Sequence, residues 1–145
     1  MSKSIFRFVD RFELLSCYIL CFISNILFNF AKTLSIDSLL LENFLKQFYD
    51  YQVYIVFLLT FTVVVFHYQM LHRKITEVYC RFIVGDTIKA ITTRYILECF
   101  IILGVAFTLS IIISTILNIN SNNNIHLASC FIIYIFISSK GVRKV

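Results

Sequence analysis

Proline is absent from this 145-residue chain, glycine occurs only three times, and charged residues make up 14% of it. The absence of proline removes a common cause of helix kinks. The shortage of charge excludes an ordinary soluble domain, in which about a quarter of the residues are charged. Because hydrophobic residues reach 59%, the composition indicates an integral membrane protein.

Motifs for catalysis and metal binding are missing as well. No G-x-x-x-x-G-K-[ST] sequence exists among so few glycines, so the chain has no ATP-binding loop of that kind. The five cysteines contain no C-x-x-C pair and are odd in number, which indicates neither a disulfide framework nor a zinc site. We find no cluster of His, Asp and Glu typical of an enzyme. We therefore expect no catalytic residue, cofactor or metal in this chain.

Four apolar runs, three of them long enough to cross a bilayer, predict an all-α membrane domain with four transmembrane helices. The expected spans are residues 12–31, 51–70, 95–117 and 125–139. The other segments are an amphipathic N-terminal helix (1–11), an extracytoplasmic amphipathic loop (32–50), a cytoplasmic coupling segment (71–94) and a cytoplasmic tail (140–145). The last run would cover only about 22 Å of a hydrocarbon core of about 30 Å, and an asparagine-rich turn (118–124) precedes it.

The basic residues set the expected orientation. Of the 13 Lys and Arg residues, all but Lys32 and Lys46 fall in the N-terminal segment, in 71–94 or in the C-terminal tail. By the positive-inside rule these three segments share one side, so both termini are expected in the cytoplasm of a bacterial cell. The net charge of +5 therefore reflects membrane topology, and we expect no nucleic-acid partner.

Small and polar residues inside the spans predict where helices pack. Asn25 and Asn29 continue a four-residue repeat in the first span, and Gly104 and Thr108 are four residues apart in the third. Both patterns are typical of helix-packing faces in membranes.

The histidines at the end of the second span have a simpler interpretation. His67 and His72 lie beside Tyr68 and Arg73, opposite Tyr51 at the start of the same span. Aromatic and polar residues of this kind anchor a helix at the membrane surface. We expect both histidines at the border of the membrane.

The coupling segment shows the pattern of a helix, a sharp turn and a second helix. Apolar residues recur at helical spacing from Ile75 to Ile83, and Glu77 lies one turn before Arg81, an order that supports a helix. Gly85 suits a left-handed helix C-cap, and Asp86 or Thr87 suits the N-cap of the next helix. A short exposed turn is therefore expected before the chain re-enters the membrane.

Glu98 is an ionisable residue at shallow depth in the third span. Such a carboxylate is costly in a membrane unless it is paired or close to water. Arg94, one helical turn earlier, is the candidate partner.

The order and spacing of Lys74, Glu77, Arg81, Gly85 and Glu98 between two spans resembles the FtsX-like permease family, the membrane subunits of MacB-type ABC transporters. The resemblance covers about residues 51–139. In that family the position of Lys74 is usually Arg, a small residue stands in place of Asp86, and the first loop often carries a large extracytoplasmic domain.

This resemblance implies a cytoplasmic ATPase, which binds ATP and Mg²⁺, and a dimeric membrane unit formed with a second copy or a related subunit. It assigns the contact with the ATPase to Lys74, Glu77, Arg81, Gly85, Asp86, Thr87 and Lys89. The chain would then couple ATP hydrolysis to movement of membrane helices, for export of, or resistance to, a peptide, a bacteriocin or a lipid-linked substrate.

A second function remains open at this point. A small multi-pass membrane immunity or interaction protein would need no ATPase. Its binding surface would be the stripe of Cys17, Cys21, Asn25 and Asn29 together with the amphipathic helix of the 32–50 loop.

Overall fold

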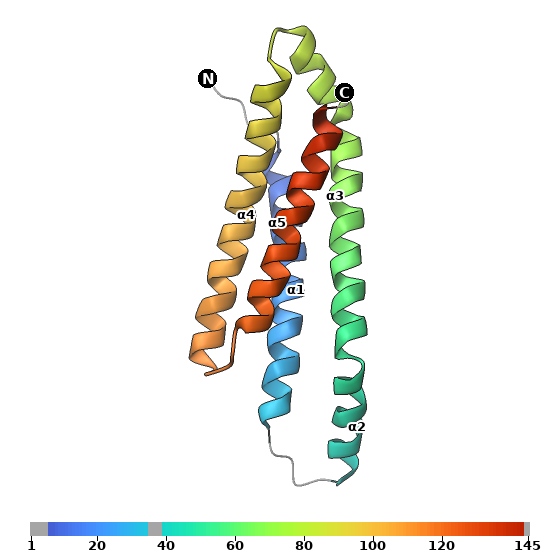
Figure 1. Cartoon of the computed structure of the whole chain (residues 1–145), viewed down its shortest axis with the longest axis vertical. Helices are drawn as coiled ribbons and strands as arrows, with labels where there is room; N and C mark the ends of the chain where they lie inside the picture. Colours follow the sequence, from blue (N-terminus) through green and yellow to red (C-terminus); the bar gives the residue numbers. More distant parts are fainter. Residues whose placement is uncertain (1–5, 35–38, 144–145) are drawn as a thin grey trace.

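The structure, a computed structural model, describes residues 6–34 and 39–143, and within these residues it contains helices and turns but no strand. The elements are α1 (Phe8–Thr33), α2 (Leu39–Asp50), α3 (Gln52–Ile83), α4 (Ile88–Ile116) and α5 (Asn122–Arg143) (Figure 1). All but α2 are long and apolar enough to cross a membrane. An all-helical, multi-pass membrane protein with four candidate spans is therefore confirmed.

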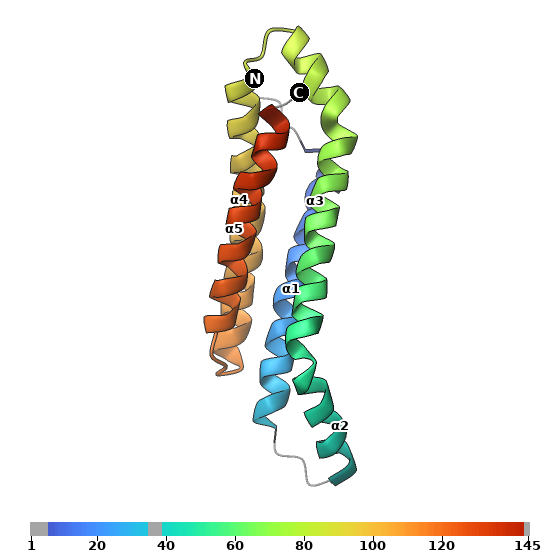
Figure 2. The same cartoon turned by 45° about the vertical axis from the view of Figure 1, so that its right-hand side comes forward.

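Each of the four long helices contains a long stretch without charged residues. Each contains a window without Asp, Glu, Lys or Arg: residues 14–31 in α1, 51–72 around α3, 99–116 in α4 and 122–139 in α5. At 1.5 Å per residue these windows are about 27 to 33 Å long, which matches a hydrocarbon core. We call them the charge-free windows. Beyond them lies a hairpin end, where α1 begins, α3 turns into α4 and α5 ends, and an α2 end on the other side (Figure 2).

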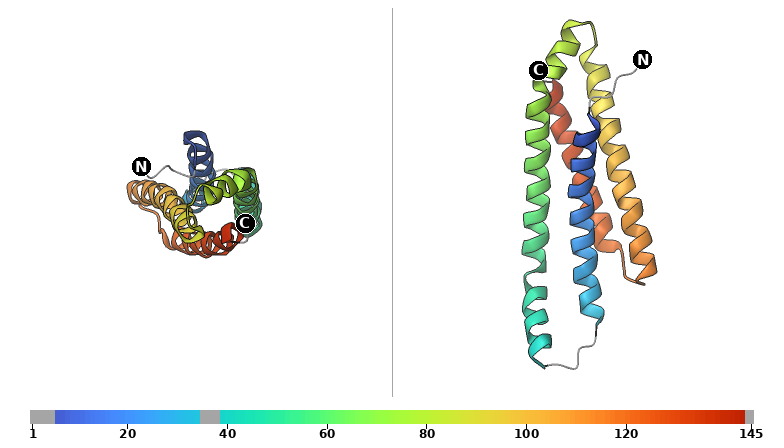
Figure 3. Two further views of the ribbon diagram at one scale, coloured as in Figure 1. Left: turned by 90° about the horizontal axis from the view of Figure 1, so that it is seen from above. Right: turned by 180° about the vertical axis from the view of Figure 1, so that it is seen from behind.

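The helices form a ring in which α1 packs on α3 and α4, and α5 packs on the same two helices. Seen from above, α3 and α4 lie across the bundle from each other, and the turn between them crosses over its end (Figure 3). Although α3 and α4 are consecutive in the sequence, they are thus joined mainly through α1 and α5.

The core follows the 3.6-residue period of each helix. On α1 the buried residues Leu14, Tyr18, Phe22 and Ile26 recur every four positions. The Tyr18 and Phe131 rings lie 5.0 Å apart between centroids, close enough for a favourable aromatic contact. This aromatic packing joins α1 to α5.

The helix ends differ from the predicted segment boundaries in three places. Residues 8–11 are the first turn of α1 and not a separate helix, while residues 1–5 of the predicted N-terminal helix lie outside the described residues. Asn122–Arg143 is one helix of 22 residues, about 33 Å long, so it includes the last three residues of the predicted asparagine turn (118–124) and most of the predicted tail. The N-terminal extension of this helix has a cause, because Asn124 is hydrogen-bonded inside the bundle.

The predicted amphipathic helix of the first loop is present as α2. Only Tyr51 separates it from α3, and the two are almost collinear (Figure 1). None of its residues is buried. Together with the end of α1, it extends beyond the α4–α5 connection (Figure 2).

Candidate functional site: the hairpin end and the polar core

The turn between α3 and α4 is closed by its own backbone. Gly85 has a φ of 109°, a left-handed conformation that only glycine adopts without strain. The Asp86 N–H donates to the Arg81 carbonyl and the Gly85 N–H to the Phe82 carbonyl, each at 3.1 Å, which is the Schellman pattern of helix ends. The Thr87 hydroxyl then accepts the Ala90 N–H at 3.3 Å and caps α4.

This local geometry matches the helix, turn and helix predicted from the sequence. We call residues 74–94 the hairpin. Side chains also close it, because Arg94 on α4 forms an ion pair with Asp86 at 3.2 Å. Its cytoplasmic position and its contact with an ATPase remain predictions.

Lys74 ties the hairpin to α1. Its ammonium lies 2.8 Å from Asp10 Oδ2 and 3.3 Å from Glu77 Oε2. Only 9% of the Lys74 side chain is exposed, so it is enclosed by this chain and cannot form part of a contact surface. A buried cation needs such partners, because an unpaired charge there is strongly unfavourable.

Glu77 holds the next turn of the hairpin. It accepts a hydrogen bond from Arg81 at 2.9 Å as well as the one from Lys74. Partial burial alone would raise the pKa of the Glu77 carboxyl, but the hydrogen bonds from Arg81 and Lys74 and their positive charges lower it below the ordinary value of 4.5. Glu77 is therefore ionised at neutral pH and serves the hairpin's own structure.

The pairing predicted for Glu98 was wrong. Glu98 Oε2 accepts the backbone N–H of Phe6 at 3.1 Å and lies 3.8 Å from Arg11. Arg94, the expected partner, is held by Asp86 instead. Glu98 therefore joins α4 to the start of α1. The start of α1 is thus bound both to α3 and to α4, which are the two arms of the hairpin.

The tip of the hairpin exposes large apolar side chains. The exposed fractions of Phe82, Ile83 and Val84 are 47%, 66% and 88%. Among the residues assigned to ATPase contact, Gly85, Thr87 and Lys89 are exposed, and Asp86 is half-buried. A hollow of about 460 Å³ lies beside the tip; it is lined by Glu77, Cys80, Arg81, Val84, Gly85, Asp86 and Arg94. Phe82, Ile83 and Val84 lie beyond the charge-free window of α3.

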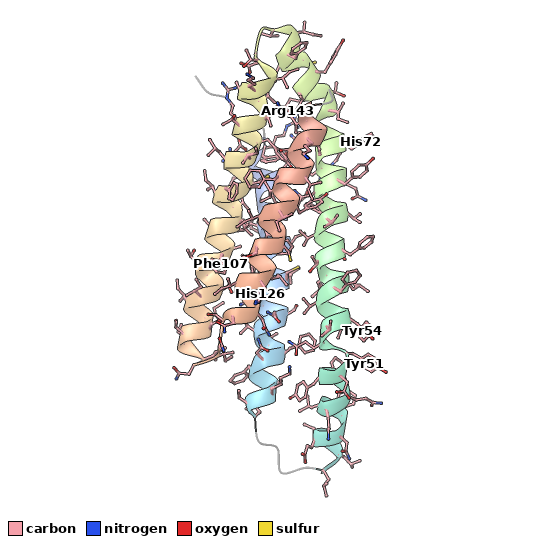
Figure 4. The ribbon with its side chains drawn as sticks, viewed as in Figure 1. Tyr51, Tyr54, His72, Phe107, His126 and Arg143 are labelled. Atoms are coloured by element: carbon pink, nitrogen blue, oxygen red, sulfur yellow. The ribbon has the colours of Figure 1, made fainter. Side chains whose placement is uncertain are left out.

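The hairpin end has an excess of positive charge. Its carboxylates, namely those of Asp10, Glu13, Glu77, Asp86 and Glu98, are all within 4.0 Å of a Lys or Arg. Within residues 6–34 and 39–143, four exposed cations at this end have no ion pair: Arg7, Lys89, Lys140 and Arg143 (Arg143 is labelled in Figure 4).

At the α2 end the bundle contains a cluster of amide side chains. Asn25 on α1 donates to Asn124 on α5 at 2.6 Å, and Asn124 donates to Ser110 on α4 at 2.7 Å. Gln52 on α3 donates to Asn25 and Asn29 at 3.4 and 3.5 Å. Asn25 and Asn29 thus join helices as predicted, and the cluster contacts all four spans.

Within the described residues of this single chain, Gly104 and Thr108 of α4 do not pack against another helix. Gly104 and Thr108 are exposed on the outside of the bundle, and a Cβ at Gly104 would meet no atom within 4 Å. Ser110 and Ser114 are the buried small residues of this helix. Since α4 is apolar on all sides, small residues alone did not indicate which side faces its neighbours.

His67 is the main feature that the sequence interpretation missed. It is completely buried in the bundle, between Tyr18 on α1 and Tyr95 on α4. By contrast, Tyr51, Tyr54 and His72 project outward from the bundle (Figure 4). The spacing of Val63, His67, Met70 and Lys74 places His67 on the buried face of α3 and was the available signal.

The described residues thus form a helical bundle with four candidate membrane spans, a polar core that links all four, and a hairpin whose two helices are bound to the start of α1. Comparison of the chain with models of protein families, with curated proteins and with solved structures gives no match.

Proposed function

We propose that the chain is the membrane subunit of an ATP-driven transporter similar to the FtsX-like, MacB-type permeases. A separate cytoplasmic ATPase would bind ATP and Mg²⁺, grip the tip of the hairpin and move α3 and α4. The membrane unit would contain a second copy or a related subunit. A peptide, a bacteriocin or a lipid-linked molecule is the expected kind of substrate.

The observation that carries this proposal is the exposed apolar tip. Ile83 and Val84 project from a turn that hydrogen bonds and ion pairs hold in shape, and they lie beyond the charge-free window. Exposed apolar residues in water are a common mark of a protein contact. The tip also carries Lys89, so the partner should offer apolar contacts and a carboxylate.

The excess of cations at the hairpin end supports a cytoplasmic position for it. Positively charged loops remain on the cytoplasmic side during insertion. An ATPase that binds a cytoplasmic hairpin also has access to ATP. In this arrangement the bundle crosses a bacterial cell membrane with both termini inside.

Purification of the chain from native membranes tests the proposal. The native chain should retain an ATP-binding protein, and Val84→Asp should lose it because a charge replaces the apolar contact. Lys140→Glu is the matched control, since Lys140 is exposed at the same end but on α5. Equal retention by the native chain and Val84→Asp would contradict the proposed contact.

The α2 helix favours the second candidate, an immunity or interaction protein without an ATPase. Its residues Leu40, Phe44 and Phe48 are 85%, 59% and 46% exposed, and they too lie outside the charge-free windows. An interaction protein of this kind should lose activity with Phe44→Asp and tolerate Val84→Asp. A transport subunit driven through the hairpin should be affected most by Val84→Asp.

A further inference from the structure

A line of hydrogen-bonding side chains crosses the interior of the bundle at His67. Tyr18 Oη contacts His67 Nε2, Tyr95 Oη lies 3.5 Å from His67 Nδ1, and Tyr95 Oη lies 2.9 Å from Ser138 Oγ. The members come from α1, α3, α4 and α5, one from each span. Tyr18, His67 and Tyr95 are at most 1% exposed, so water cannot replace a missing partner.

The direction of this line follows from its last member. The Ser138 hydroxyl donates to the Ile135 carbonyl at 3.0 Å. A hydroxyl has a single proton, so in the arrangement that contains this bond Ser138 accepts from Tyr95. Tyr95 then has no proton left for His67 and accepts one from it. This arrangement places a proton on His67 Nδ1.

The other ring nitrogen is then fixed too. A neutral imidazole with a proton on Nδ1 has a lone pair on Nε2, which accepts the hydroxyl proton of Tyr18. Every donor in the line is used in this arrangement. A second proton on His67 would leave the Tyr18 hydroxyl without an acceptor in an apolar interior, which is costly.

The neighbouring tyrosine does not compete for the imidazole. Tyr134 on α5 places its ring against His67 at 5.4 Å between centroids, nearly perpendicular. Its hydroxyl donates elsewhere, to the Val64 carbonyl at 3.0 Å. Tyr134 thus contributes packing to the site and no hydrogen bond to His67.

The location of the line relates it to the hairpin. His67 lies two helical turns before Lys74 on the first arm, about 10 Å along α3, and Tyr95 follows Arg94 on the second arm. Since α3 and α4 lie across the bundle from each other, the contact between His67 and Tyr95 bridges the two arms inside the bundle. At 3.5 Å it is the longest contact in the line and hence the first to change when the arms move.

We infer that His67 is a positioning residue, held as the neutral imidazole with its proton on Nδ1, that joins both arms of the hairpin to α1 and α5. Its effect on transport rests on the proposed function. A displacement of α3 and α4 is then transmitted to all four spans through the buried imidazole of His67.

Nitrogen NMR of the purified full-length chain with ¹⁵N-labelled histidine tests the assignment directly. The chain has only three histidines, and His67→Gln identifies the signal of His67. We expect a protonated Nδ1 and an unprotonated, hydrogen-bonded Nε2. A proton on Nε2 would overturn the direction of the line.

A double-mutant cycle tests whether the line acts as a unit. Tyr18→Phe and Tyr95→Phe each remove one hydroxyl and keep the ring. Together they should lower the melting temperature by clearly less than the sum of their separate effects, because either change already breaks the line. Tyr134→Phe is the control and should add to Tyr18→Phe, since its hydroxyl lies outside the line. Additive effects of Tyr18→Phe and Tyr95→Phe would contradict the inference.

Transmission is tested with the transporter assembled in vesicles. The Tyr18→Phe, Tyr95→Phe chain should bind the ATPase as the native chain does but lose most of the stimulation of ATP hydrolysis by the membrane subunit. Unchanged stimulation would contradict the role of His67 in transmission. Failure of the native chain to bind any ATPase would contradict the proposed function alone, because the NMR and stability tests do not depend on it.

Discussion

Asp10 and Lys74 face each other at 2.8 Å across α1 and α3, the shortest ion pair among the described residues. Both side chains are almost enclosed, with 12% and 9% exposed. This pair fixes the start of α1 against the base of the hairpin, and it explains why Lys74 is unsuitable for contact with a partner.

Removal of one member of this pair should be costly. Asp10→Asn leaves the buried Lys74 with weaker compensation, and we expect a loss on the order of 3 kcal/mol in stability. Arg73→Gln is the control, because Arg73 pairs with Glu13 at the surface and should contribute less than about 1 kcal/mol. Thermal unfolding followed by circular dichroism measures both. Equal losses of stability in the two variants would contradict the assignment of Asp10 and Lys74 as a buried ion pair.

The turn at Gly85 should be sensitive to a single methyl group. Gly85→Ala places a Cβ on a residue with φ of 109°, and the strain should cost about 1 to 2 kcal/mol. No atom within 4 Å would meet that Cβ, so the effect is one of backbone conformation. Gly104→Ala is the matched control inside a helix and should be neutral or stabilising by up to about 1 kcal/mol. Gly85→Ala should therefore lower the melting temperature, whereas Gly104→Ala should leave it unchanged or raise it.

How far the sequence predicts this molecule depends on how local each feature is. Gly85 and the Glu77 to Arg81 spacing act within one helical turn, and their conformations could be predicted. The residues next to His67 in the sequence do not predict that it is buried, because Tyr68 and His72 face outward. Its burial depends on α1, α4 and α5, which the chain brings together only on folding.

The same reasoning applies to the small residues of α4. Gly104 and Ser110 both look suitable for close packing, and nothing local distinguishes them. Ser110 is the buried one because Asn124, on the next helix, donates a hydrogen bond to it. The ends of α5 were likewise misjudged because apolar runs alone do not include polar residues such as Asn124 that fold into the bundle.

The amide cluster should contribute to stability through Asn124. Asn124→Ala removes the hydrogen bonds with Asn25 and Ser110 and leaves their polar groups buried, at a cost of roughly 1 to 3 kcal/mol. Asn123→Ala, an exposed neighbour in the same turn, should change stability by less than about 0.5 kcal/mol. Chemical unfolding in detergent micelles compares the two. A larger effect at Asn123 would show that the cluster is misassigned.

The hairpin should loosen in acid because of Glu77. Its pKa in the folded chain is below the ordinary value of 4.5, so ionised Glu77 contributes stability above about pH 4.5, and this contribution is lost as the pH falls through the lowered pKa. Glu77→Gln should remove this part of the pH dependence. Hydrogen exchange of the backbone of residues 74–94, compared at about pH 6 and about pH 3 after correction for intrinsic rates, measures the change.

Orientation can be checked with a native cysteine. Cys80 is exposed on the hairpin, so a membrane-impermeant maleimide should modify it only after the cells are opened. A cysteine introduced at Asn120, in the α4–α5 connection, should react in intact cells when Cys80 is replaced by Ser. Reaction of Cys80 in intact cells would place the hairpin on the outer side and contradict the proposed topology.

The central claim is that the tip of the hairpin contacts a cytoplasmic ATPase, and photo-crosslinking in living cells tests it most directly. A photoreactive amino acid at Val84, which is 88% exposed, should form a crosslink to one ATP-binding protein. The same group at Ile133, exposed within the charge-free window of α5, should give no such product. Crosslinks from position 84 to lipid, or only to another membrane protein, would contradict the account.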